Sequence, residues 1–137
     1  GPARVVDGDN ILIGGLTINL YNIDAPEPDQ MCHDADGSLY PCGQRATNAL
    51  VSLTLGQFVR CLGDKTDKQG HLIRTCYVED MNINQEMVLR GWALVYRQKK
   101  FDEDYLRVEQ AAKKFGIGIW RGEFETPWDW RNLEKIK

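Results

Sequence analysis

Asp24 and Glu27 flank a proline-stiffened turn in the segment TINLYNIDAPE, residues 17–27, at the end of an apolar strand. A third acid, Asp9, lies in VVDGDN at the start of the preceding strand. Neighbouring strands of a meander can bring Asp9 and Asp24 side by side, and two carboxylates with a backbone carbonyl and water suit Ca²⁺. The alternative is that both segments are turns closed by Asx hydrogen bonds, and spacing alone favours this alternative.

Short apolar runs separated by turn residues indicate the elements that position these acids. Turns that contain glycine divide the first three strands, and DKQG separates a later pair. Each of three helical patterns is followed by a glycine, and Asn82 is the expected cap of the second. The expected strands are 3–6, 10–13, 16–22, 57–63, 71–78 and 92–96, and the expected helices are 44–55, 82–90 and 102–115.

The order of these elements predicts one domain over residues 1–137, of the α+β class and mainly β. Short strands and turn glycines suit a small closed barrel of the OB type that is decorated by helices. The last helix is expected to face the core with Tyr105, Val108, Ala112 and Phe115. The aromatic tail segments GIW and PWDW are expected to seal the packing of barrel and helices.

The four cysteines fall into two pairs. Cys61 and Cys76 lie in strand-like runs, and a hairpin tip at residues 68–69 places them opposite each other, close enough for a bridge. Cys32 and Cys42 bracket a polar loop. We expect the disulfides Cys32–Cys42 and Cys61–Cys76, with reduced thiols or a zinc site as the alternatives. Two disulfides imply an oxidising compartment, so we expect an exported protein, periplasmic or secreted.

Composition restricts the partners. The chain has 137 residues and a net charge of -3, and its pI of about 5.4 lacks the basic character typical of nucleic-acid binders. No apolar run approaches the ~20 residues that a membrane helix needs. We expect a monomer without a membrane partner. The acidic balance disfavours single-stranded nucleic acid, although a local basic patch would still allow it, and a protein partner is the alternative.

A series of motifs runs through the chain in a recognisable order: VVDGDN, IDAPE, Cys-x9-CGQ-x-A, DKQGH, GWALVY, E-x-x-AKKFGIGIW and PWDW. This series resembles the staphylococcal-nuclease-like, or thermonuclease, family over roughly residues 4–131. The resemblance implies a five-stranded OB-type barrel with about three helices. In active members of the family it implies Ca²⁺-dependent hydrolysis of DNA and RNA phosphodiesters.

The same resemblance implies roles for the acids. Asp9, Asp24 and the backbone carbonyl of Ala25 correspond to the family's calcium ligands. Glu27 corresponds to the glutamate that orients or deprotonates the attacking water. This chemistry requires these groups because the cation polarises the phosphate while a carboxylate prepares the nucleophile.

The family's two arginine positions carry other residues. Active members have one arginine five residues before the aspartate of DAPE, where this chain has Asn19, and a second in D-x-Y-G-R, where it has His71. An arginine fork pairs two phosphate oxygens and stabilises charge in the transition state. Loss of two such donors would cost on the order of 10⁴–10⁶ in rate.

Three functions are consistent with this pattern. The two absent arginines favour a degenerate nuclease, weak or inactive, that serves as a module for binding nucleic acid or protein. The second is an active Ca²⁺-dependent endonuclease with a rearranged site, in which Arg60, Arg74 or Arg97 replaces the missing charge. The third is an exported protein-interaction module that uses exposed loop aromatics such as Tyr40.

Overall fold

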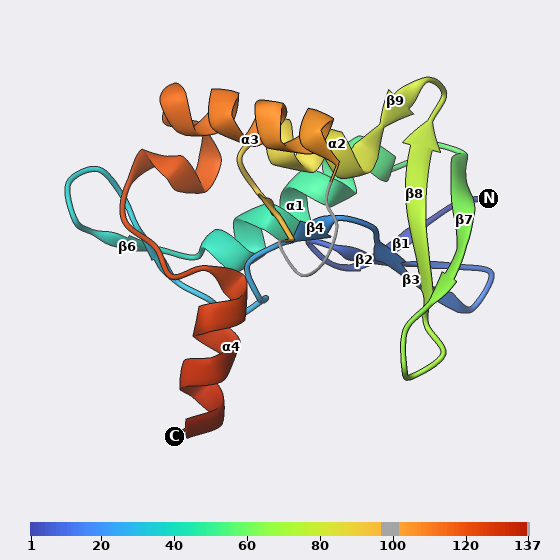
Figure 1. The fold of residues 1–137 in the computed structure, drawn as a ribbon, viewed down its shortest axis with the longest axis horizontal. Coiled ribbons are helices and arrows are strands. Elements are labelled where there is room, and N and C mark those ends of the chain that lie inside the picture. Colours follow the sequence, from blue (N-terminus) through green and yellow to red (C-terminus); the bar gives the residue numbers. More distant parts are fainter. Residues whose placement is uncertain (97–101, 137) are drawn as a thin grey trace.

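The computed structural model describes residues 1–96 and 102–136, and its strands and helices are shown in Figure 1. The strands are β1 (Arg4–Asp7), β2 (Asn10–Ile13), β3 (Leu16–Leu20), β4 (Ile23–Asp24), β5 (Cys32–His33), β6 (Leu39–Tyr40), β7 (Val59–Thr66), β8 (Leu72–Val78), β9 (Met81–Asn82) and β10 (Leu94–Val95). The helices are α1 (Cys42–Thr54), α2 (Ile83–Leu89), α3 (Glu103–Lys114), the 3-10 helix η1 (Gly118–Arg121) and α4 (Pro127–Ile136).

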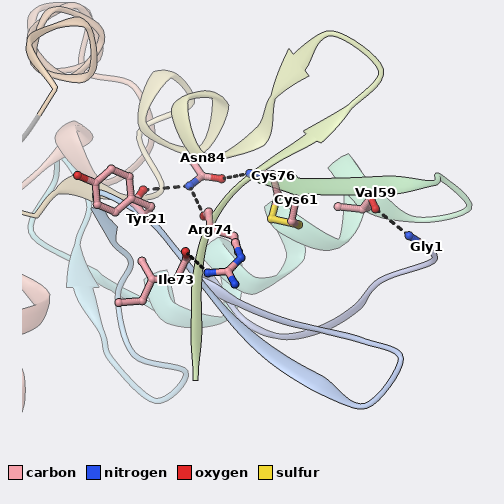
Figure 2. Close-up of a disulfide and its surroundings, with 8 residues drawn as sticks. All are labelled: Gly1, Tyr21, Val59, Cys61, Ile73, Arg74, Cys76 and Asn84. Atoms are coloured by element: carbon pink, nitrogen blue, oxygen red, sulfur yellow. Dashed lines mark hydrogen bonds between the residues drawn. A yellow bond between two sulfur atoms is a disulfide. The ribbon is translucent and has the colours of Figure 1, made fainter. Parts of the chain in front are cut away.

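The main sheet has the strand order β1-β2-β3-β8-β7, with β9 added to β8. All of its pairs are antiparallel except β3 with β8, which is parallel. The sheet curls, and residues ahead of β1 reach the far edge: Pro2 bridges Phe58, and the Gly1 amine donates to the Val59 carbonyl at 2.9 Å (Figure 2). The α+β, mainly β, barrel-like fold predicted from the sequence is confirmed.

The registers around β3 determine where the acids lie. Asn10 in β2 pairs with Asn19 in β3, and the Leu20 amide donates to the Asp9 carbonyl at 2.9 Å. The start of β2 therefore lies beside the end of β3, from which the chain turns into β4 and Asp24. The meander thus brings VVDGDN and IDAPE together, although spacing alone favoured two separate turns.

Both predicted disulfides are confirmed. Cys61 pairs with Cys76 across β7 and β8, with 4.0 Å between the two Cα atoms. Cys32 and Cys42 close the loop that holds β5 and β6, with 5.6 Å between their Cα atoms. Such bonds are typical of proteins from oxidising compartments.

The described helices divide into three that the sequence predicts and two, η1 and α4, that it does not. α1, α2 and α3 form close to their predicted bounds, and the Asn82 side chain caps α2 by accepting the Gln85 amide at 3.0 Å. α4 was not predicted, because PWDW was interpreted only as an aromatic packing segment. No helix among the described residues is long and apolar enough to cross a membrane.

Two predictions of burial are wrong. Phe115 is 72% exposed because α3 ends at Lys114, so that Phe115 is the cap residue and no longer continues the buried face of the helix. Tyr40 is only 5% exposed, so it is no exposed loop aromatic. It packs with the Cys32–Cys42 disulfide and Ile119 in a second apolar cluster, against which Trp92 and three aromatics from the C-terminal part of the chain pack: Trp120, Phe124 and Trp128.

A buried asparagine joins α2 to the strands that lead to the acids (Figure 2). Asn84 is fully buried, and its side-chain oxygen accepts the Cys76 amide at 3.0 Å. Its side-chain nitrogen donates to the Tyr21 carbonyl at 2.9 Å and to the Arg74 carbonyl at 3.1 Å. One side chain thereby satisfies backbone groups on β8 and on the turn between β3 and β4.

We expect Asn84→Ala to lower the free energy of unfolding by about 2–4 kcal/mol, because it leaves buried backbone groups unsatisfied. Urea unfolding followed by circular dichroism measures this loss. The control is Asn48→Ala on the exposed face of α1, which should change the free energy by less than about 0.5 kcal/mol. Equal stability of the two variants would contradict the structural role of Asn84.

Candidate functional site

A single cleft of about 1390 Å³ lies where β2, β3 and β4 meet the loop between β7 and β8. Every side chain predicted to belong to the site lines it: Asp9, Asn19, Asp24, Glu27 and His71. Ala25, whose carbonyl is the predicted backbone ligand, is buried next to Asp24. The structure therefore gathers in one place the residues that sequence reasoning singled out separately.

Asp9 connects the two acidic turns. Its Oδ2 accepts the Ala25 amide at 2.8 Å, and its Oδ1 accepts the Asn10 side-chain amide at 2.8 Å. Desolvation, followed by the negative charges of Asp7 and Asp24, raises the pKa of Asp9 well above its ordinary value. This carboxylate is in surroundings that favour a nearby positive charge.

The backbone of the IDAPE turn is held by α1 and by a buried glutamine. Gly43, at the start of α1, packs so tightly against Glu27 that a Cβ would lie 1.7 Å from the Glu27 carbonyl oxygen. Gln30 is fully buried, its Oε1 accepts the Glu27 amide at 3.2 Å, and its Nε2 donates to the Glu125 carbonyl at 2.9 Å. Gln30 thus links the turn that carries Glu27 to the segment that leads into α4.

Arg131 of α4 binds two of the three acids. Its Nη1 donates to Asp24 Oδ1 at 2.9 Å and to Glu27 Oε1 at 2.7 Å, and its Nη2 donates to Asp24 Oδ2 at 2.5 Å. Asp24 is almost fully buried and Glu27 is partly exposed. The hydrogen bonds to Asp24 are the main cause that raises the pKa of Arg131, so the guanidinium is charged at any ordinary pH.

Aromatic packing places α4 at the cleft. Pro127 occupies the first position of the helix, where its missing amide hydrogen costs no hydrogen bond. The Trp128 ring meets the Tyr96 ring edge-on, with centroids 6.1 Å apart. In Figure 1, α4 runs away from the rest of the fold after this anchor. Arg131 lies one turn beyond Pro127 and points back to the acids.

Asn19 and His71, which are predicted to stand at the family's arginine positions, share one carboxylate. Asn19 donates to Asp67 Oδ2 at 3.0 Å, and Nδ1 of His71 lies 3.2 Å from the same oxygen. Asp67 Oδ1 accepts the backbone amides of Gln69 and His71, each at 2.9 Å. Desolvation alone would raise the pKa of Asp67, but these amides and His71 outweigh it and lower the pKa.

The sequence model of the family described as staphylococcal nuclease homologue matches residues 17–122. The chain belongs to the staphylococcal nuclease family. Its fold agrees with this membership. α4 and Arg131 lie beyond the matched residues.

Relatives with this similarity include proteins from bacteria and plants. The chain is 36% identical to the succinoglycan biosynthesis protein ExoI of Rhizobium meliloti, over 91% of this chain and 66% of that protein. An uncharacterized endonuclease of Haemophilus influenzae is 32% identical over 97% of this chain and 72% of its own length. The probable staphylococcal-like nuclease CAN3 of Oryza sativa subsp. japonica is 30% identical over 93% of this chain and 31% of its own length.

Three arginines were considered as replacements for the two arginines that active family members carry. The two that lie in strands, Arg60 and Arg74, do not line the cleft. Arg60 stacks on the Tyr77 ring, 4.8 Å from its centroid, and Arg74 donates to the Ile73 carbonyl at 2.9 Å. Arg97 lies outside the described residues. Among the described residues that line the cleft, the arginine is Arg131, which sequence reasoning missed. The one available signal was its place directly after PWDW, whose aromatic residues anchor α4.

The oxygen donors of the cleft suit a hard divalent cation such as Ca²⁺. Asp9 and Asp24 supply carboxylates to the cleft, and the carbonyl of the adjacent Ala25 is the predicted backbone ligand; these are the ligand types that calcium prefers. Among the described residues, no three His, Cys, Asp or Glu side chains form a metal-binding group. A cation here would therefore need backbone and water oxygens, and it would meet Asp24 in competition with Arg131.

In metal-free buffer we expect Arg131→Gln to lower the free energy of unfolding by about 1–3 kcal/mol, since the nearly buried Asp24 loses its partner. The Arg131 side chain is 34% exposed, so solvent screening holds the loss below that of a fully buried pair. Denaturant unfolding in the presence of a chelator measures it. Lys135→Gln removes one charge from the exposed face of α4 and should have little effect. Equal losses would contradict a specific pair.

Proposed function

We propose that this protein is a slow, Ca²⁺-dependent phosphodiesterase that cleaves single-stranded nucleic acid. The observation that supports this proposal is the meeting of Asp9, Asp24 and Glu27 in one cleft of a staphylococcal nuclease fold. Relatives named as endonucleases agree with it. The two disulfides support an exported protein, and we propose that it acts as a monomer.

The acids have distinct roles in the proposed reaction. Asp9, Asp24 and the Ala25 carbonyl would hold Ca²⁺, which supplies Lewis-acid polarisation of the phosphate when bound. Glu27 lies three residues from Asp24 on a turn fixed by Gln30, and it would orient or deprotonate the attacking water. The leaving oxygen needs a proton, and His71 lines the same cleft as a donor for it.

Aromatic and basic side chains of the cleft suit a single strand. Tyr21 and Tyr96 line it, and bases stack on such rings without regard to sequence. The Lys65 ammonium lies 4.8 Å from the centroid of the Tyr21 ring, where it adds positive charge for a phosphate. A duplex would present its bases to neither ring.

The slow rate in this proposal follows from the residues that bind Asp67. Neither Asn19 nor His71 offers a phosphate the two-pronged contact of a guanidinium. Loss of one preorganised donor costs about 10²–10³ in rate, and loss of two costs on the order of 10⁴–10⁶.

The binding of Asn19 and His71 to Asp67 also favours a second candidate function. In this alternative the cleft binds nucleic acid or protein without hydrolysis, because the phosphate-binding half of the site is committed to an internal contact.

The test is cleavage of denatured DNA by the wild type and by Glu27→Gln, purified in parallel, with Ca²⁺ and with a chelator. We expect calcium-dependent cleavage that falls by about 10²-fold or more in Glu27→Gln, because the variant lacks the base. Equal traces of cleavage from both proteins would identify a contaminant. That result would reject hydrolysis and support the binding module.

A gain of function provides a second test. We expect Asn19→Arg to raise the calcium-dependent rate by about 10²-fold, since it returns a guanidinium to the position that active members use. Asn19→Gln, which keeps an amide at the same position, is the control. Initial rates on one defined oligonucleotide compare the three proteins, and no gain in Asn19→Arg would show that the missing arginine does not limit the rate.

A further inference from the structure

The contact between Arg131 and the acids occupies the atoms that a metal would use. The guanidinium forms hydrogen bonds to both carboxylate oxygens of Asp24 and to one oxygen of Glu27. The Asp24 side chain is only 6% exposed, so it has little free surface to offer a second cation. In this arrangement the predicted metal ligand and the predicted base are bound by one residue of α4.

We propose that Arg131 and a divalent cation are alternative occupants of Asp24, and that calcium binding releases α4 from the cleft. The proposal rests on the calcium-dependent function proposed above. It assigns Arg131 the role of an internal cation that holds the site closed until the metal replaces it.

Electrostatic repulsion disfavours the simultaneous binding of Arg131 and a divalent cation to Asp24. A metal that coordinates Asp24 would lie within a few ångströms of the guanidinium carbon, and like charges at such distances in partly desolvated surroundings repel strongly. Each Asp24 oxygen already accepts a charged donor, so metal coordination replaces at least one of these hydrogen bonds. Glu27 loses its contact with Arg131 in the same step and becomes free to act on water.

The position of α4 allows this exchange. Gln30 and Trp128 hold the entrance of the helix through Glu125 and Tyr96, and neither contact involves Arg131. Beyond Arg131, the helix is exposed at residues 132–135, and Leu133 is 45% exposed. Release of the guanidinium therefore requires movement of an exposed helix end without disruption of either apolar cluster.

If the contact between Arg131 and the acids were a purely structural ion pair, removal of Arg131 would change the metal affinity differently. If Arg131 only stabilised the fold, its removal would weaken metal binding or leave it unchanged, because Asp24 would lose order. Competition predicts tighter binding after removal of Arg131, because the metal no longer displaces a bound cation.

The experiment is calorimetric titration of CaCl₂ into the wild type, Arg131→Gln and Lys135→Gln, without substrate. We expect Arg131→Gln to bind calcium about tenfold to hundredfold more tightly than the wild type. Lys135→Gln removes the same charge from the same helix and should remain within about twofold of the wild type, because an exposed charge is screened by salt. Circular dichroism verifies that each variant is folded.

Amide hydrogen exchange of the wild type tests the release of α4 without any substitution. We expect the amides of residues 131–136 to exchange faster at saturating CaCl₂, whereas residues in α1 keep their protection. Unchanged exchange in α4 at saturating calcium would overturn the proposal. Equal calcium affinity of the wild type and Arg131→Gln, or equal gains in the two variants, would overturn it as well.

These outcomes separate this proposal from the proposed hydrolysis. Tighter calcium binding in Arg131→Gln without any cleavage by the wild type supports the exchange and rejects the nuclease function. Calcium-dependent cleavage with equal affinities supports the nuclease function and rejects the exchange. Absence of calcium binding in all three proteins rejects both.

Discussion

Asp9 and Asp24 repel each other within one cleft, and this repulsion has to be offset by positive charge because the surroundings are partly desolvated. Two neighbouring carboxylates, one in the turn between β1 and β2 and one in β4, would otherwise destabilise the segments that carry them. The described structure offsets the charge of Asp24 with Arg131, and it surrounds Asp9 with the amide hydrogens of Ala25 and Asn10. The position of α4 depends on this balance, and so does the calcium affinity in the proposed exchange.

The scaffold keeps the acids together through contacts that do not involve the acids' own charges. Asn84 fixes the turn after β3 to β8 and α2, while Gln30 and Gly43 fix the IDAPE turn to α1. Because these contacts are made by buried amides and by tight backbone packing, they are insensitive to whether a guanidinium or a metal faces Asp24. In the proposal, a metal can therefore replace the Arg131 guanidinium at Asp24 while the turns that carry the acids stay in place. The movement is then confined to α4.

Turn positions and short apolar runs in the sequence predicted one disulfide and allowed the meeting of two of the acids. The hairpin tip placed Cys61 opposite Cys76, and the meander placed Asp9 near Asp24, because strand register follows from turn position. Arg131 could not be found in this way, since it lies 107 residues from Asp24 and reaches it only through the packing of α4. The shared binding of Asn19 and His71 to Asp67 likewise depends on how the β7–β8 loop lies against β3.

The charge balance of the cleft explains how an acidic site could accept a polyanion. Its described lining holds four carboxylates and two permanent cations: Asp9, Asp24, Glu27 and Asp67, with Lys65 and Arg131. Four negative charges against two positive ones leave an excess of two negative charges, which repels a phosphate at close range. In the proposed exchange, a divalent cation would cancel this excess and free the Arg131 guanidinium, whose fork matches phosphate oxygens. Metal binding would then convert an internal counter-charge into a substrate contact, so that nucleic acid binds after the metal and not before it.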